Sequence, residues 1–77
     1  MDLYFYEECE FSQIVLHTIS SLKIEDKINF KDIRLNLTFL AELKKIAGSQ
    51  TVPCLNTKDG FIKESIEIRR YLLEKFK

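Results

Sequence analysis

The chain of 77 residues is 45% hydrophobic and 31% charged, which suits one small folded domain and leaves no room for a second. Its 12 Lys and Arg residues balance its 12 Asp and Glu residues, so there is no basic excess to bind a nucleic-acid backbone. No apolar run reaches the roughly 18 residues that a membrane-spanning helix requires, and the N-terminus lacks the pattern of a secretory signal. We therefore expect a single cytoplasmic domain over residues 1–77 that binds neither nucleic acid nor membrane.

Two cysteines and one histidine restrict the metal and disulfide chemistry open to the chain. Cys9 and Cys54 are too few to build a disulfide framework, and a single histidine does not complete a Cys/His zinc set. We therefore expect no metal cofactor, whereas chemistry at a single thiol stays open.

The first part of the chain alternates strand and helix patterns. Leu3–Tyr6 is a short aromatic-rich run typical of a buried strand. A helix is predicted from near Cys9 onward, because apolar residues recur at spacings of three and four. Its predicted apolar face consists of Phe11, Ile14, Val15, Ile19 and Leu22. After a charged break at 23–27, Ile28–Ile33 half alternates apolar with polar residues, which predicts a second strand.

A second helix is predicted after this strand. Asn36 and Thr38 are both credible N-caps, and Gly48 can end the helix in the left-handed conformation. The apolar stripe of this helix consists of Leu40, Leu43, Ile46 and Ala47.

The last part of the chain predicts a hairpin and a final helix. The short apolar runs Val52–Asn56 and Phe61–Lys63 flank Thr57–Gly60, where the Asp-Gly pair supplies the positive backbone angles of a tight reversal. Ser65 is predicted to cap the final helix, which has an apolar residue at every fourth position. The buried face of this helix is predicted to consist of Ile68, Leu72 and Phe76.

The order of these elements (βαβαββα) places the chain in the α/β class. Two strands joined by a helix run parallel, and the later hairpin adds antiparallel strands to the same sheet, since a separate sheet would lack a core. We therefore expect a four-stranded mixed sheet flanked by three helices, with helices on both faces.

Cys9 lies at the junction between the first strand and the first helix. Unpaired backbone N–H groups and the helix dipole favour a thiolate there, so a nucleophile is predicted. Ser12 replaces the second cysteine of a C-x-x-C pair, and its hydroxyl can hydrogen-bond a thiolate but cannot resolve a mixed disulfide. Glu7 and Glu8 oppose ionisation, because neighbouring negative charge raises a thiol pKa. The alternative interpretation of Cys9 is a small buried side chain without chemistry.

Thr51, Val52 and Pro53 precede the third predicted strand. A proline at the start of a strand is a candidate for a cis peptide bond, in which Val52 would offer its N–H and C=O groups to an extended peptide. An ordinary trans proline at a sheet edge is the alternative.

Three motifs in this order resemble one superfamily. They are Cys9-Glu10-Phe11-Ser12 after an aromatic first strand, Thr51-Val52-Pro53 before the hairpin, and Glu64-Ser65 at the last helix. Together they are similar to the motifs of glutaredoxins and of the thioredoxin-fold N-terminal domain of glutathione transferases. The resemblance covers nearly the whole chain and implies a thioredoxin-like fold in a single glutaredoxin-like domain.

The resemblance also implies roles for individual residues. Cys9, in a C-x-x-S motif with Ser12, would attack a glutathionylated sulfur. Val52 would pair its backbone with the cysteinyl unit of glutathione, beside a cis Pro53. This chain departs from the family pattern, because Glu10 stands where proline usually follows the nucleophile and no basic residue precedes it.

The two ends of glutathione need charged or polar partners. By the resemblance, Glu64-Ser65 would hold the γ-glutamyl end, with helix N–H groups and a hydroxyl for the carboxylate and the glutamate for the ammonium group. A plain capping serine beside a solvated glutamate is the alternative. For the glycine carboxylate, Gln50, just before Thr51, lies where the family often has Gln or Arg, and Lys44 or Lys45 could assist.

Three further residues, Cys54, His17 and Tyr6, have predicted positions relative to the core, the surface and the site. Cys54 is predicted to be a buried packing residue, with a resolving or redox-sensing thiol as the alternative. His17 is predicted on the surface, and Tyr6 is expected to flank the site at the end of the first strand.

We therefore predict a glutathione-dependent monothiol thiol–disulfide oxidoreductase, which uses Cys9 and the co-substrate glutathione to act on glutathionylated proteins or small disulfides. A glutathione-binding or protein-docking module with little catalysis is a second hypothesis, motivated by the acidic flank of Cys9. An iron–sulfur carrier, in which the Cys9 thiols of two subunits and two glutathione thiols hold the cluster, is a third. A transferase acting on electrophiles is not favoured, since no residues are left for the second helical domain of that family.

Overall fold

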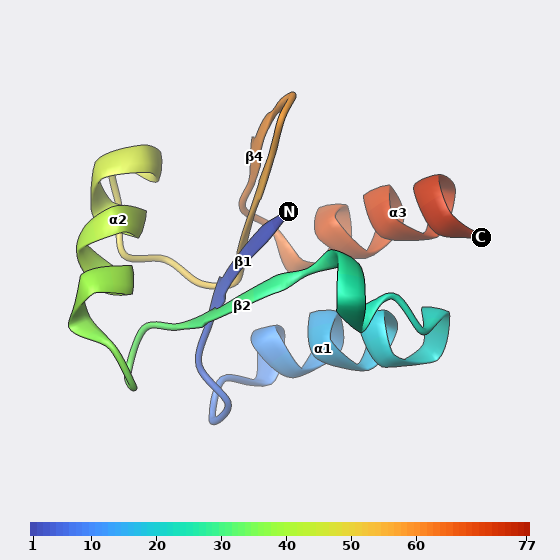
Figure 1. The fold of residues 1–77 in the computed structure, drawn as a ribbon, viewed down its shortest axis with the longest axis horizontal. Helices are drawn as coiled ribbons and strands as arrows, with labels where there is room; N and C mark the ends of the chain where they lie inside the picture. The colour runs from blue at the N-terminus through green and yellow to red at the C-terminus, as the bar shows by residue number, and fades with distance from the viewer.

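The computed structural model describes residues 1–77 as a four-stranded sheet with helices on both faces (Figure 1). In chain order the elements are β1 (Asp2–Phe5), α1 (Glu10–Leu22), a 3-10 turn η1 (Glu25–Lys27), β2 (Asn29–Asp32), α2 (Leu37–Ala47), β3 (Cys54–Thr57), β4 (Gly60–Ile62) and α3 (Ser65–Phe76). This order confirms the predicted α/β arrangement, which is thioredoxin-like. None of the helices combines the length and the apolar character needed to cross a membrane.

The strands lie in the order β2-β1-β3-β4, with β1 and β2 parallel and the other neighbours antiparallel. β1 is therefore a central strand, and Leu3 faces Phe30 of β2 on one side and Leu55 of β3 on the other. Three of its four residues are buried, which explains why this strand is almost continuously apolar and aromatic.

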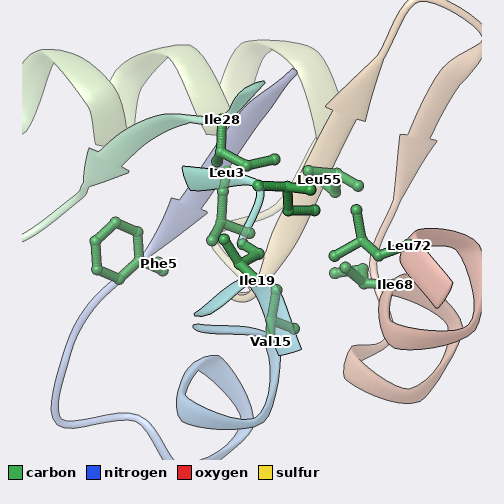
Figure 2. Packing of buried hydrophobic residues seen from close by; sticks show 9 residues of the cluster. Leu3, Phe5, Val15, Ile19, Ile28, Leu55, Ile68 and Leu72 are labelled. Carbon is green, nitrogen blue, oxygen red and sulfur yellow. The ribbon is translucent and has the colours of Figure 1, made fainter. Parts of the chain in front are cut away.

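One face of the sheet is covered by α1 and α3, which lie side by side (Figure 1). Nine buried residues form the core on this face: Leu3, Phe5, Val15, Ile19, Ile24, Ile28, Leu55, Ile68 and Leu72. All of them except Ile24 are labelled in Figure 2. Phe76 packs against this cluster while only partly buried, so the predicted apolar face of the last helix is confirmed.

The opposite face is covered by α2. Its smaller core consists of Tyr4, Ile33, Leu43 and Cys54. Leu40 and Ala47 pack against this cluster, whereas Ile46, predicted on the same stripe, is 37% exposed. Residues of β1 thus alternate between the two cores, with Leu3 and Phe5 on one side and Tyr4 on the other.

The buried face of α1 differs from the prediction. Phe11 is 60% exposed and Ile14 is 40% exposed, although both were expected in the core. The buried stripe instead runs through Ser12, Val15 and Ile19, again at spacings of three and four. Val15 and Ile19 belong to the predicted face, so the buried face is rotated from it toward the small polar residues Ser12 and Thr18, which the sheet and α3 cover.

Helix ends and the hairpin turn follow the predicted chemistry in part. The Asn36 side chain accepts a hydrogen bond of 2.9 Å from the Thr38 backbone N–H, so Asn36 is the cap of α2. Gly48 ends this helix with a left-handed φ of 72°. In the hairpin the positive backbone angle falls on Gly60 alone, with φ of 128°, so the prediction of positive angles at both Asp59 and Gly60 is half correct.

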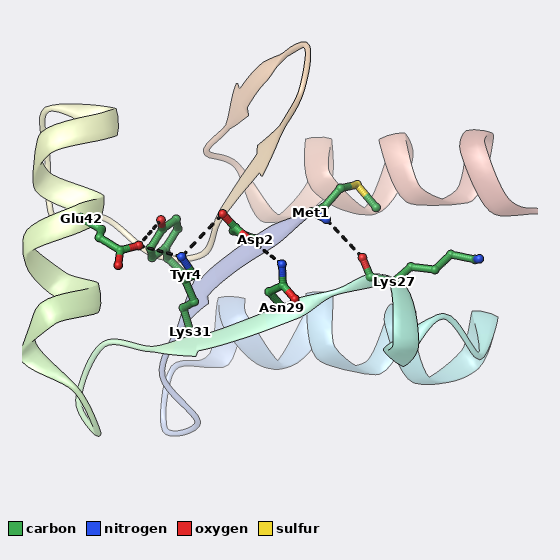
Figure 3. Close-up of polar contacts among 7 residues, drawn as sticks. All are labelled: Met1, Asp2, Tyr4, Lys27, Asn29, Lys31 and Glu42. Carbon is green, nitrogen blue, oxygen red and sulfur yellow. Dashed lines mark hydrogen bonds and ion pairs between the residues drawn. The ribbon is translucent and has the colours of Figure 1, made fainter.

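A polar network joins α2 to the centre of the sheet (Figure 3). The Lys31 ammonium group lies 2.7 Å from the Glu42 carboxylate and 3.6 Å from that of Asp2. The buried Tyr4 donates a 2.9 Å hydrogen bond from its hydroxyl to the same oxygen of Glu42. The network therefore satisfies the one polar group of an otherwise buried ring and fixes α2 against β1 and β2.

The network changes the ionisation of its members. The pKa of Glu42 is lowered, chiefly by the hydrogen bond from Lys31 and then by that from Tyr4. The pKa of Lys31 is raised, chiefly by its hydrogen bond with Glu42. The stabilisation from Glu42 is therefore present above its ordinary pKa of 4.5 and is lost as the pH falls through the lowered value.

We predict that Glu42→Gln lowers the free energy of unfolding at pH 7, because the ion pair with Lys31 is lost. The difference from the wild type should shrink as the pH falls below 4.5, where the wild-type carboxylate is itself protonated. Chemical denaturation at a series of pH values measures this, with Glu74→Gln on the exposed face of α3 as the matched control. A difference that stays constant down to pH 2 would contradict the role of the charge.

Candidate functional site

The strand pairing brings four separate segments to one end of the sheet. β1 and β2 are parallel and finish together, at Phe5 and Asp32. β3 is antiparallel to β1 and starts at Cys54, which faces Tyr4. β4 returns alongside β3 and finishes at Ile62, which faces Leu55. Residues 6–9, 33–35, 51–53 and 63–65 therefore gather at one end, which we call the Cys9 end of the sheet.

A hollow of about 270 Å³ lies at the Cys9 end. Its wall consists of Phe11, Thr51, Val52, Pro53, Lys63, Glu64, Ser65 and Ile66. These residues come from the start of α1, the segment before β3 and the start of α3. All three sequence motifs thus contribute to the wall, the first through Phe11 alone, and the structure adds Lys63 and Ile66, which belong to none of the motifs.

The segment before β3 forms one side of the hollow. Pro53 is buried, and the peptide bond that joins it to Val52 is cis. Val52 is half-buried and packs against the core beneath α2. Gln50 was predicted to contribute to the site, but it is exposed and does not line the hollow.

The start of α3 forms the opposite side. Ser65 was predicted as the helix cap, but the cap is Glu64, with an extended backbone and no side-chain capping bond. Ser65 is instead the first residue of the helix and is only 7% exposed. The first N–H groups of a helix have no intrahelical acceptor, so the start of α3 offers donors and the positive end of a helix dipole to an anion in the hollow.

Lys63 is the cation of the hollow, and the sequence reasoning missed it. Its ammonium group lies 5.5 Å from the centroid of the Phe61 ring. The pair Lys44-Lys45, which had been suggested for a ligand carboxylate, is exposed on α2 and does not line the wall. The position of Lys63 directly before Glu64-Ser65 was a usable signal, because the residue after β4 must lie beside the start of α3.

Phe11 and Ile66 give the hollow an apolar rim. They are 60% and 66% exposed, yet both line the wall. Phe11 follows Cys9 by two residues on α1, so its ring connects the hollow to the segment that carries the thiol.

Cys9 is the N-cap residue of α1, as the sequence predicts. Its backbone N–H donates to the carbonyl of Tyr6 at 3.2 Å, and its own carbonyl accepts from the N–H of Gln13 at 3.0 Å. The thiol is free and partly exposed, although Cys9 does not itself line the hollow. Ser12 lies one helical turn further on, fully buried, and its hydroxyl has no hydrogen-bond partner in the structure.

The pKa of the Cys9 thiol is lowered from its ordinary value of 9.0. Burial by itself raises the pKa, but the N–H and hydroxyl of Ser12, then the Phe11 N–H and the Tyr6 hydroxyl, favour the thiolate and outweigh it. This direction agrees with the thiolate predicted at the helix start, and the opposing effect expected of Glu7 and Glu8 is not among the causes of the shift. Glu8 is exposed and pairs with Arg34 at 3.2 Å, so much of its charge is compensated.

Cys54 and His17 take the places predicted for them. Cys54 is fully buried in the core beneath α2, and burial raises the pKa of its thiol, although the charge of Lys63 acts in the opposite direction. His17 is exposed on α1.

Comparison with known families identifies this arrangement. The model described as "Glutathione S-transferase, N-terminal domain" matches residues 8–75. The chain belongs to the family of glutathione S-transferase N-terminal domains. The match includes the thiol, the segment before β3 and the start of α3, so all three motifs lie within the family region.

A solved structure agrees with this assignment. The domain is similar to an epsilon-class glutathione S-transferase from the housefly, Musca domestica, with 25% sequence identity and a TM-score of 0.79. The alignment covers 97% of this chain and 34% of the housefly chain, so the domain spans about a third of that protein. No curated protein matches significantly.

We predict that Ser12→Ala raises the pKa of Cys9, because the buried hydroxyl, which has no other partner, is no longer available to stabilise the thiolate. Alkylation of Cys9 at pH 7 should slow about threefold, which corresponds to roughly half a pKa unit. The measurement is the rate of alkylation against pH, with the modified cysteine located by mass spectrometry. Ser20→Ala, on the exposed face of the same helix, is the control and should leave the profile unchanged.

Proposed function

We propose that this domain binds glutathione in the hollow and uses the Cys9 thiolate to remove glutathione from mixed disulfides. Its partners would be glutathionylated proteins or small disulfides. The observation that carries this proposal is that a backbone segment, a helix start and a cation surround the hollow, while Phe11 links it to a thiol of lowered pKa.

The lining suits the γ-glutamyl end of glutathione. The α-carboxylate of glutathione would accept hydrogen bonds from the first backbone N–H groups of α3 and from the Ser65 hydroxyl, while Lys63 supplies positive charge. Its α-ammonium group would pair with the carboxylate of Glu64. The two charges of this zwitterion thus have opposite partners within one hollow.

The cysteinyl part of the tripeptide would lie along Val52. A half-buried residue that precedes a strand can pair its backbone groups with an extended peptide, as in strand addition. This placement directs the glutathione sulfur toward Phe11 and the segment that carries Cys9.

The reaction would need one protein thiol. In the first step the Cys9 thiolate attacks the glutathione sulfur of a mixed disulfide, so that a Cys9–glutathione disulfide forms and the substrate leaves as its thiolate. In the second step the thiolate of a second glutathione attacks this disulfide, which releases oxidised glutathione and regenerates the Cys9 thiolate. Ser12 cannot take the place of the second glutathione, because a hydroxyl forms no disulfide, and its role is donation to the thiolate.

The state of the cysteines fits the cytoplasmic setting expected from the sequence. Cys9 and Cys54 are both free, and free thiols persist in reducing compartments where glutathione is abundant.

We predict that Cys9→Ser abolishes deglutathionylation of a small mixed-disulfide substrate, because serine forms no disulfide with glutathione. Cys54→Ala should retain the activity, since that thiol is buried away from the hollow. The measurement is the rate of oxidised glutathione production in the presence of glutathione and a reductase. Equal rates for the wild type and Cys9→Ser would reject the proposed reaction.

We predict that Lys63→Met weakens glutathione binding about fivefold, because a partly exposed charge contact contributes on the order of 1 kcal/mol. Lys58→Met, at the opposite end of the hairpin, is the matched control and should bind as the wild type does. Titration of chemical shifts with glutathione gives the affinities, and the shifted resonances should include Val52, Lys63 and Ser65. Binding that leaves all three unmoved would place the ligand elsewhere.

The comparison with the housefly enzyme favours a second candidate, the transfer of glutathione to apolar electrophiles. The exposed Phe11 and Ile66 at the rim suit an apolar co-substrate. The domain spans 34% of that enzyme, so this activity is proposed for the domain together with further chain. The two candidates respond differently to Cys9→Ser, because a serine hydroxyl can still hydrogen-bond the thiolate of glutathione during transfer. A conjugation assay with a chloronitrobenzene electrophile separates them.

A further inference from the structure

Arg34 reaches from the loop after β2 to the loop that carries Cys9. Its guanidinium carbon lies 3.8 Å from the centroid of the Tyr6 ring, within the range of a close stacking contact. Its Nη1 atom also lies 3.2 Å from a carboxylate oxygen of Glu8. One side chain thus contacts two residues of the four-residue segment that ends at the thiol.

The backbone of Arg34 is itself held in place. The Asp32 carboxylate accepts a 2.9 Å hydrogen bond from the Arg34 N–H and a second of 3.3 Å from the Leu35 N–H. The preceding residue, Ile33, is buried and donates from its N–H to the carbonyl of Phe5 at 2.9 Å. The base of Arg34 is therefore fixed at the end of β1, directly beside Tyr6.

Tyr6 connects Arg34 to the thiol. Its carbonyl accepts the Cys9 backbone N–H at 3.2 Å, and its hydroxyl is one of the donors that lower the pKa of Cys9. Tyr6 is only partly buried, so its ring needs a partner on the solvent side to keep one orientation. The planar guanidinium of Arg34 supplies that partner.

We propose that Arg34 is a positioning residue for Cys9, which acts by holding the Tyr6 ring in place and by compensating the charge of Glu8. This role rests on the proposed function, because it assumes that the Cys9 thiol is the reacting group. Nothing in the sequence order indicates this role, since all of α1, η1 and β2 lie between Cys9 and Arg34.

The effect of removing Arg34 depends on the charged residues around the Cys9 thiol. Glu7 and Glu8 precede the thiol, and Glu10 follows it in the first turn of α1. On the other side of the Cys9 end, the hollow contains Lys63 and Glu64, which are opposite in charge. Without Arg34, Glu8 loses its ion-pair partner and the acidic side of the thiol is no longer compensated.

The test compares Arg34→Met with a matched control, Arg70→Met. Arg70 is also exposed and pairs with a carboxylate, that of Glu67, at 3.2 Å, but on α3. The measurement is the alkylation rate of Cys9 against pH for each folded variant, with Cys9 identified by mass spectrometry. We expect Arg34→Met to move the midpoint of the alkylation-rate profile to higher pH and to slow alkylation at pH 7 about threefold. Arg70→Met should give the wild-type profile.

A second comparison uses Tyr6→Phe, which keeps the ring and removes the hydroxyl. If Arg34 acts through Tyr6, then Arg34→Met should shift the midpoint less in the Tyr6→Phe background than in the wild type. An equal shift in both backgrounds would overturn the role of the stacking contact. An unshifted midpoint in Arg34→Met alone would overturn the whole proposal.

The readout separates this inference from the proposed function. Alkylation requires neither glutathione nor a disulfide substrate. A shifted midpoint without any deglutathionylation would therefore retain the positioning role and reject the proposed reaction. An unshifted midpoint with normal deglutathionylation would reject the positioning role and retain the proposed reaction.

Discussion

The pairing of β1 with its two neighbours is the constraint on which the rest of the structure depends. Because β2 is parallel to β1 and β3 is antiparallel to it, the residues after β1, after β2 and before β3 meet at one end of the sheet. The return of β4 adds the start of α3 to the same end. A slip of this register by one residue would exchange Leu3 and Tyr4 between the two cores, so burial on both faces holds the register in place.

The two cores support different parts of the site. The larger core packs α1 and α3 on one face, and it thereby sets the starts of both helices, with Cys9 and Ser65, at the Cys9 end. The smaller core and the network of Tyr4, Lys31 and Glu42 hold α2 on the other face. The chain that leaves α2 leads directly to Val52 and Pro53, so the second core positions the backbone side of the hollow.

The pKa of the Cys9 thiol depends on neighbouring polar groups more than on the net charge of the flanking sequence. The sequence around Cys9 is acidic, yet the pKa of the thiol is lowered, because the polar groups of Ser12, Phe11 and Tyr6 favour the thiolate and outweigh the effect of burial. Exposed carboxylates such as that of Glu8 act through water and are compensated by a partner from another loop. A hydrogen-bonded thiolate at a helix start is thus compatible with a flank that contains no basic residue.

The sequence by itself determined the order of the elements, the thiol at the start of α1, the hairpin, and the backbone and helix-start motifs at positions 51–53 and 64–65, because these features are encoded by neighbouring residues. Tertiary structure alone decided that Phe11 lines the hollow and lies outside the core, that Lys63 is its cation and Gln50 is not in its wall, and that Arg34 compensates Glu8. The apolar periodicity of α1 includes Phe11 and Ile14, and only contact with the sheet and α3 decides that Ser12 and Thr18 are buried in their place. The partners of a charge depend on which loops the strand pairing brings together, and no spacing along the chain specifies that.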